Sequence, residues 1–240
     1  MKIEELRNYG KAFSDAESSW PDEVKREMNR IGMKIVFGSL NFIEKVRFAF
    51  AFARERRRMS RIDLSDIRAK GMNNESFIKT QIEIAALYSA LSQTIGKDRT
   101  QESMNQIMEA TAPKALGLCM PLPEEFNTFD DTLQAFKAYF VPVPEASRQA
   151  GCNIIEIAED TEDSFQYEMT YCVWYEIAKK LGVPDACLSN CYSDDLFFPD
   201  YYDAIGLEYS QTNTIARGGD RCDYRLTRSK RIGKKTGSRP

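Results

Sequence analysis

Apolar residues recur at helical spacing through most of the first 150 residues. The clearest stripe lies in residues 76–95, is closed by Gly96, and consists of Phe77, Ile78, Ile82, Ala85, Leu87, Tyr88, Leu91 and Ile95. Further helices are predicted from Pro21 onward, over residues 99–112 with Pro113 as the stop, and over residues 130–140. The basic run at residues 54–58 follows another apolar stripe. We interpret it as a solvated helix end, where cations are stabilised.

After Gly151 the pattern becomes typical of strands. Apolar and polar residues alternate over residues 165–171, with Phe165, Tyr167, Met169 and Tyr171 set against Gln166, Glu168 and Thr170. Strands are also predicted over residues 153–157, 205–215 and 221–226, and a helix over residues 172–181. A glycine turn at residues 217–220 would join the last two strands. So short a turn predicts antiparallel pairing.

Together these elements predict an α+β protein with one domain, residues 1–227. Its mainly helical part, residues 1–150, packs on a small antiparallel sheet formed within residues 151–227, where we expect the functional site. Residues 228–240 hold six basic residues and no acid, and are predicted to form a basic flexible tail. Such a tail could instead touch RNA or an acidic membrane surface.

Composition narrows the class of protein. The chain has 240 residues, of which 42% are hydrophobic and 29% charged, as in soluble globular proteins. No apolar run approaches the roughly 20 residues that span a bilayer, and the amino terminus has no signal-peptide core. We therefore expect a cytoplasmic protein without a membrane partner. Outside the tail, 27 basic residues stand against 36 acidic ones, which argues against nucleic-acid binding.

The chain contains no histidine. This excludes a Ser-His-Asp or Cys-His relay, and every metal site that needs imidazole. Proton transfer must therefore rely on Asp, Glu, Cys, Lys or Tyr with shifted pKa values. Five of the six cysteines lie in the last 90 residues, and in a cytosolic protein they should be thiols.

The cysteines divide into two groups. Cys119, Cys152 and Cys187 are expected to pack as small buried hydrophobic residues. For Cys172 and Cys191, which have polar neighbours, packing and chemistry stay equally open. If residues 187–195 are helical, Cys191 shares one face with Cys187 and with Asp194. In an alternative arrangement, Cys172, Cys191 and Cys222 bind zinc or another soft metal; otherwise no cofactor is expected.

Several of these residues carry a family resemblance. Tyr171-Cys172, Cys191 with Asp194, and the run from Thr214 through Gly218-Gly219-Asp220 and Cys222-Asp223 to Tyr224 resemble the L-2-amino-thiazoline-4-carboxylic acid hydrolase family over residues 165–226. The ending also resembles small-molecule-binding domains of the 4-vinyl-reductase type. The two resemblances together imply a shared α+β ligand-binding scaffold.

The resemblance implies hydrolytic opening of a 2-aminothiazoline ring to an N-carbamoyl cysteine. We hypothesise that Cys172 is the nucleophile, because it begins a predicted helix whose positive end stabilises a thiolate. Asp194 or Asp220 would move the proton, and Arg217 or Arg221 would bind the substrate carboxylate. The remaining catalytic candidates are Cys191 and Cys222, and the remaining substrate-binding candidates are Glu168, Thr170, Thr214, Gly218, Gly219 and Asp223.

Two other functions fit the same scaffold. One is a non-catalytic binding or sensor module that holds a hydrophobic or tetrapyrrole-like ligand. The other is a biosynthetic enzyme that forms or rearranges a cysteine-derived ring. The partner expected in each case is a small molecule. The chain could also form an oligomer, since the aromatic residues within 194–202 could serve as core, pocket lid or dimer contact.

Overall fold

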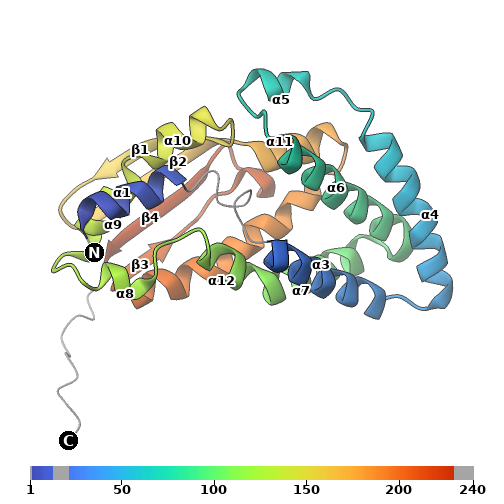
Figure 1. The fold of residues 1–240 in the computed structure, drawn as a ribbon, viewed down its shortest axis with the longest axis horizontal. Coiled ribbons are helices and arrows are strands. Elements are labelled where there is room, and N and C mark those ends of the chain that lie inside the picture. The colour runs from blue at the N-terminus through green and yellow to red at the C-terminus, as the bar shows by residue number, and fades with distance from the viewer. Residues whose placement is uncertain (1, 13–21, 230–240) are drawn as a thin grey trace, which may run out of the picture.

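A computed structural model describes residues 2–12 and 22–229. It confirms the α+β class, with helices surrounding one antiparallel sheet (Figure 1). The helices are α1 Ile3–Ala12, α3 Asp22–Gly38, α4 Phe42–Met59, α5 Ser65–Ala69, α6 Glu75–Ile95, α7 Lys97–Gly117, α8 Pro123–Phe126, α9 Thr132–Phe140, α10 Val143–Gln149, α11 Val173–Lys180 and α12 Leu188–Ala204. The strands are β1 Asn153–Asp160, β2 Ser164–Cys172, β3 Leu207–Ser210 and β4 Cys222–Arg228. The predicted helix start at Pro21 lies outside the described residues.

The sheet has the strand order β1-β2-β4-β3, so the last strand of the chain lies beside β2 in its interior. The predicted alternation in β2 is confirmed, since Phe165 and Tyr167 are buried in the core. Tyr167 pairs with Tyr224 of β4, and the two rings stack with centroids 4.7 Å apart. Neighbouring residues point to opposite faces of a sheet, so Glu168 and its partner Asp223 lie on the other face.

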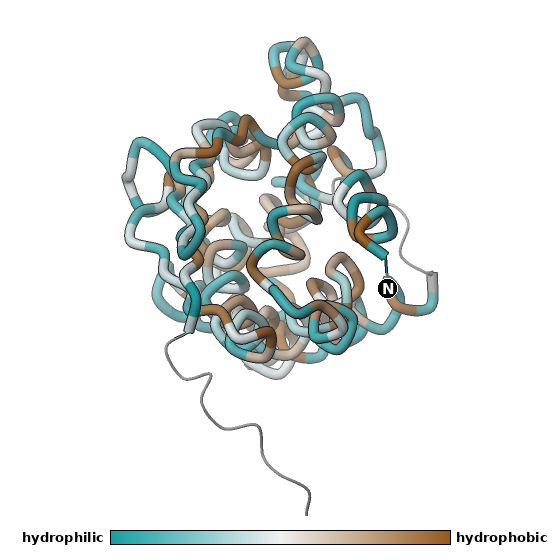
Figure 2. Tube along the Cα trace, turned by 90° about the vertical axis from the view of Figure 1, so that its left-hand side faces the viewer, coloured by the Kyte–Doolittle hydropathy of each residue, from teal (hydrophilic) through white to brown (hydrophobic). Residues whose placement is uncertain are grey.

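Aromatic side chains dominate the core between the sheet and the helices α9 and α12. Phe136 of α9 is 1% exposed and packs edge-on against Phe165 and Tyr202, with ring centroids 6.0 and 5.5 Å away. The helices α3, α4, α6 and α7 form a helical half of the protein that extends beyond one end of the sheet (Figure 1). Figure 2 shows hydrophobic and hydrophilic residues interleaved along the helices, as expected when each helix buries one stripe.

The basic run at residues 54–58 closes α4, as predicted, with Arg56, Arg57 and Arg58 in its last turn. The acid within the run has a structural role. Glu55 is 5% exposed, and its carboxylate accepts hydrogen bonds from Arg54 and Arg58 at 3.3 and 2.9 Å. None of the helices in the described part of the chain is long and apolar enough to cross a membrane.

Two predicted boundaries are wrong. α7 continues through Pro113 to Gly117, because proline removes only one backbone donor and α7 is held by packing on α12, α6 and α3. The strand predicted over residues 205–215 is limited to β3, and β3 and β4 are joined by the longer loop 211–221, not by a tight glycine turn. The Asp223 carboxylate accepts the amides of Thr212 and Asn213, which draws these residues out of the ladder. The antiparallel pairing of β3 and β4 is confirmed.

Arg228, predicted from the sequence to belong to the basic tail, is the last residue of β4. Its guanidinium forms a bidentate pair with Asp131 at 2.7 and 3.0 Å, which ties β4 to the start of α9. Residues 230–240, the rest of the predicted tail, lie outside the described residues.

Candidate active site

Four cysteines from four elements come together where β2, β4 and α12 meet. Cys172 ends β2, and Cys222 begins β4. Cys187 ends the short 3₁₀ helix Pro184–Cys187 and leads into α12, and Cys191 lies one turn further on. The buried Cys187 thiol interacts with the thiols of Cys172 and Cys191, which together with burial raises the pKa of Cys187. Cys187 is therefore a thiol that can donate its proton to a neighbouring sulfur.

Cys191 has the environment of a reactive thiol. The Cys187 hydrogen bond is the main cause that lowers the pKa of Cys191, and the Arg217 charge and the Thr214 hydroxyl act in the same direction against burial. Arg217 lies in the short 3₁₀ helix Ile215–Arg217 of the loop before β4. A lowered pKa in a partly exposed cysteine favours the nucleophilic thiolate.

Asp194 lies three residues after Cys191, on the same face of α12, as predicted. Burial of its carboxyl, followed by the neighbouring Cys191, raises the pKa of Asp194 to about 8. The Tyr224 hydroxyl donates a hydrogen bond to this carboxyl at 3.2 Å and opposes that shift. Asp194 as a whole residue is partly buried. Near neutral pH it holds a proton that it can donate.

Cys222 has the opposite character to Cys191. Its sulfur accepts a hydrogen bond from the backbone amide of Ile215 at 3.3 Å. Burial nevertheless dominates and raises the pKa of Cys222 to about 12. Cys222 is therefore protonated at neutral pH and holds the loop to the first residue of β4.

The loop 211–221 is shaped by Asp223 and two glycines. Gly218 has a φ of +93°, a left-handed conformation that favours glycine. A side chain at Gly219 would meet Asn213 Oδ1 at 2.6 Å and the Thr214 carbonyl oxygen at 2.9 Å. This close turn places the buried Thr214 beside Cys191.

The remaining predicted residues do not join the thiol cluster. Arg221 pairs with Asp220 at 2.9 Å and with Glu168 at 2.7 Å, and Asp220 is exposed. Glu168 lies on the sheet face opposite Tyr224, and Thr170 is exposed. Asp223 lies on the Glu168 face and its carboxylate holds the loop. Arg217 does face the site, with its guanidinium paired to Asp195.

Among residues 2–12 and 22–229, no group of three or more cysteine or acidic side chains is arranged to hold a metal ion. The thiol of Cys187 forms hydrogen bonds with the sulfurs of Cys172 and Cys191. A zinc or other soft-metal site at Cys172, Cys191 and Cys222 stays a prediction.

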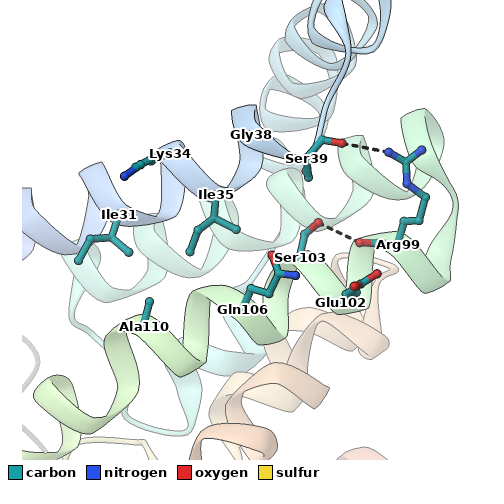
Figure 3. A pocket seen from close by; sticks show the side chains of 10 residues that line it. All are labelled: Ile31, Lys34, Ile35, Gly38, Ser39, Arg99, Glu102, Ser103, Gln106 and Ala110. Carbon is teal, nitrogen blue, oxygen red and sulfur yellow. Dashed lines mark hydrogen bonds between the residues drawn. The ribbon is translucent and has the colours of Figure 1, made fainter.

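Two cavities lie away from the thiol cluster, in the helical half. One, of about 640 Å³, is a groove between α3 and α7 where Ile31 and Ile35 face Gln106 and Ala110 (Figure 3). The other, of about 760 Å³, lies between α4 and α6. Neither is lined by a predicted site residue.

Sequence reasoning missed three groups near the site. Cys187 was predicted to be only a packing residue, and Tyr224 and Tyr209 were not among the site residues. The sequence did contain a signal for the tyrosines. Tyr209 and Tyr224 alternate with polar neighbours, so both point to the face of the sheet on which Asp194 of α12 lies.

These features define an α+β protein with a thiol-rich, histidine-free candidate active site. The sequence pattern of a known family, L-2-amino-thiazoline-4-carboxylic acid hydrolase, matches residues 76–226, and the chain belongs to this family. The matched part runs from α6 into β4 and contains every residue of the thiol cluster. No curated protein and no solved structure matches the chain. The resemblance to domains of the 4-vinyl-reductase type stays a prediction.

Proposed function

We propose that the protein hydrolyses 2-aminothiazoline-4-carboxylate, or a closely related cysteine-derived ring, to an N-carbamoyl cysteine. The observation that carries this proposal is the pair formed by Cys191 and Asp194. The environment lowers the pKa of the thiol and raises that of the carboxyl three residues away. Neighbouring groups whose pKa values are pushed apart are typical of a nucleophile or base beside an acid. The membership in a family named for this hydrolysis supports the substrate.

Cys191 is the nucleophile in this proposal. The sequence favoured Cys172, which occupies the N-cap position of α11 without a side-chain capping bond, but only Cys191 lies beside both Arg217 and Asp194. The Cys191 thiolate adds to the ring carbon between sulfur and nitrogen, while Asp194 transfers its proton to the ring nitrogen. The bond from that carbon to the ring sulfur then breaks, and the sulfur leaves as a thiolate that takes a proton from the resulting isothiouronium.

Water completes the reaction. It adds to the same carbon, and its proton returns to the Asp194 carboxylate. The bond between that carbon and the Cys191 sulfur breaks, which regenerates the thiolate and releases the ureido product. Over the cycle one water is consumed and neither enzyme group changes. Cys187 donates a hydrogen bond to the Cys191 thiolate and so makes it a better leaving group.

Arg217 is the candidate for the substrate carboxylate. Its charge acts on both Cys191 and Asp194, and 46% of its side chain is exposed. A substrate carboxylate would replace Asp195 on the guanidinium, which binds such groups through two parallel hydrogen bonds. Arg221 already pairs with two acids, Asp220 and Glu168, away from the thiols.

The test is thiol release from L-2-amino-thiazoline-4-carboxylate, measured colorimetrically. We expect turnover by the wild type with or without a chelator, and its loss in Cys191→Ser. Cys119→Ser is the matched control, because Cys119 lies two residues after α7, where its thiol bonds the Ala115 carbonyl. Loss of activity in Cys172→Ser alone would return the nucleophile to the sequence-based choice. A folded wild type that releases no thiol would refute the proposed substrate and favour a non-catalytic binding module.

A further inference from the structure

Buried polar atoms without partners gather in one short segment beside Asp194. Among the described residues, three such side-chain atoms lie within residues 209–211: the Tyr209 hydroxyl and both polar atoms of the Gln211 amide. A buried polar atom without a hydrogen bond is costly, so native proteins contain few of them. Their concentration in one short segment indicates a binding site whose hydrogen bonds are completed by a ligand.

Their position links them to the site. Tyr209 of β3 pairs with Leu226 of β4. The Tyr209 ring packs against the rings of Tyr202 and Phe198 on the core side of the sheet. Gln211 follows the last residue of β3, and both atoms of its side-chain amide are buried. Its backbone runs alongside Tyr224, because Ser210 pairs with Arg225 and the Asp223 amide bonds the Asn213 carbonyl at 3.2 Å. The Tyr224 hydroxyl bonds Asp194.

The neighbouring tyrosines already have polar partners. Tyr202 and Tyr167 share a hydrogen bond, and Tyr224 bonds Asp194. The Tyr209 hydroxyl has none, although the charge of Asp194 acts on it. Thr214, three residues after Gln211, bonds the Cys191 thiol. The unpartnered atoms of Tyr209 and Gln211 therefore lie in the segment that runs from the neighbourhood of Asp194 to that of Cys191.

We propose that Gln211 and Tyr209 form a subsite that binds a neutral, planar group in which an N–H donor and a nitrogen or oxygen acceptor are attached to one carbon and point to the same side, as in a urea, a primary amide or an amidine. A carboxamide both donates and accepts in one plane, so it pairs with such a group through two parallel hydrogen bonds. A carboxylate is a poorer match, because the Gln211 carbonyl would face a second acceptor. This inference rests on the proposed function, since it assigns the nitrogen-bearing end of that substrate and of its ureido product to this subsite.

The test uses two ligands that differ only in the group to be recognised. N-carbamoyl-L-alanine carries an NH₂ where N-acetyl-L-alanine carries a methyl, and neither has a thiol that could react. Binding to the wild type and to Gln211→Leu is measured by calorimetry. We expect the wild type to bind the carbamoyl ligand about tenfold more tightly. Gln211→Leu should bind both ligands equally, with its affinity for the acetyl ligand unchanged.

Gln166→Leu is the matched control. Gln166 lies in β2 next to Tyr167 and pairs with Arg225, so its side chain points to the opposite face of the sheet. It should keep the tenfold preference. A ligand-binding role also predicts that Gln211→Leu melts no lower than the wild type without ligand, because the variant removes buried atoms that lack partners.

Three results would overturn the subsite. In the first, the wild type does not prefer the carbamoyl ligand, which would mean that water alone satisfies these atoms. In the second, the preference persists in Gln211→Leu, and in the third, Gln211→Leu melts at a lower temperature and binds neither ligand. Thiol release from the thiazoline is assayed separately. If the wild type shows the Gln211-dependent preference but no hydrolysis, the proposed reaction is refuted and the subsite is supported. If it hydrolyses the thiazoline without that preference, the subsite is refuted and the proposed reaction is supported.

Discussion

Replacing Asp194 by asparagine should stabilise the protein and inactivate it. Asparagine keeps the shape of a protonated carboxyl and can still accept the Tyr224 hydrogen bond that spans 3.2 Å. The unfolded chain releases the Asp194 proton near its ordinary pKa of 3.8, whereas the folded protein holds it to about pH 8. Between these values unfolding releases a proton, so the wild-type free energy of unfolding falls as pH rises, by up to about 1.4 kcal/mol per pH unit.

The variant has no such proton, so its stability advantage should grow from pH 5 to pH 7 by about 2 kcal/mol, somewhat less than the full slope because water reaches part of the residue. Above about pH 8 the advantage should stay constant. Urea denaturation of both proteins at pH 5, 7 and 9 measures it. Thiol release should fall by about 100-fold or more, since the proton donor is gone. A stability difference that is the same at all three pH values would refute the raised pKa.

Three further results are expected. Iodoacetamide at pH 7 should alkylate Cys191 before Cys187, because the environment lowers the pKa of Cys191 and raises that of Cys187. Peptide mass spectrometry of samples taken at successive times gives the order, and faster labelling of Cys187 would contradict it. Gly219→Ala should lower the free energy of unfolding in denaturant by about 1–3 kcal/mol and impair turnover, because its Cβ would lie 2.6 Å from Asn213 Oδ1. The control Gly117→Ala, whose Cβ would have nothing within 4 Å, should be neutral or slightly stabilising. Phe136→Ala should lower the free energy of unfolding by about 3–5 kcal/mol, and a loss under 1 kcal/mol would show that this ring is not central to the core.

Local periodicity accounts for the parts of the fold that were predicted. Strand β2 was recognisable because Tyr167 and its alternating neighbours face a core on one side only. The spacing of Cys191 and Asp194 on one helix face likewise follows from sequence distance, once the segment is helical.

The parts that could not be predicted depend on contacts between distant segments. Asp223 gives no sequence signal that it binds the amides of Thr212 and Asn213, yet those bonds replace the expected glycine hairpin with a long loop. The role of Cys187 depends on two other sulfurs, one of them on β2. Arg221 would serve a carboxylate equally well in sequence terms, but the fold pairs it with Glu168 and Asp220.

The position of β4 inside the sheet has a consequence for how the sheet can assemble. Because the strand order is β1-β2-β4-β3, β4 separates β2 from β3, and β3 pairs with β4 alone. As long as residues 222–228 are out of place, β2 has an unpaired edge and β3 has no partner. Unpaired edges of this kind invite association with other chains. Cys222 and Tyr224 both lie in β4, so they reach Cys191 and Asp194 only when β4 occupies its place in the sheet.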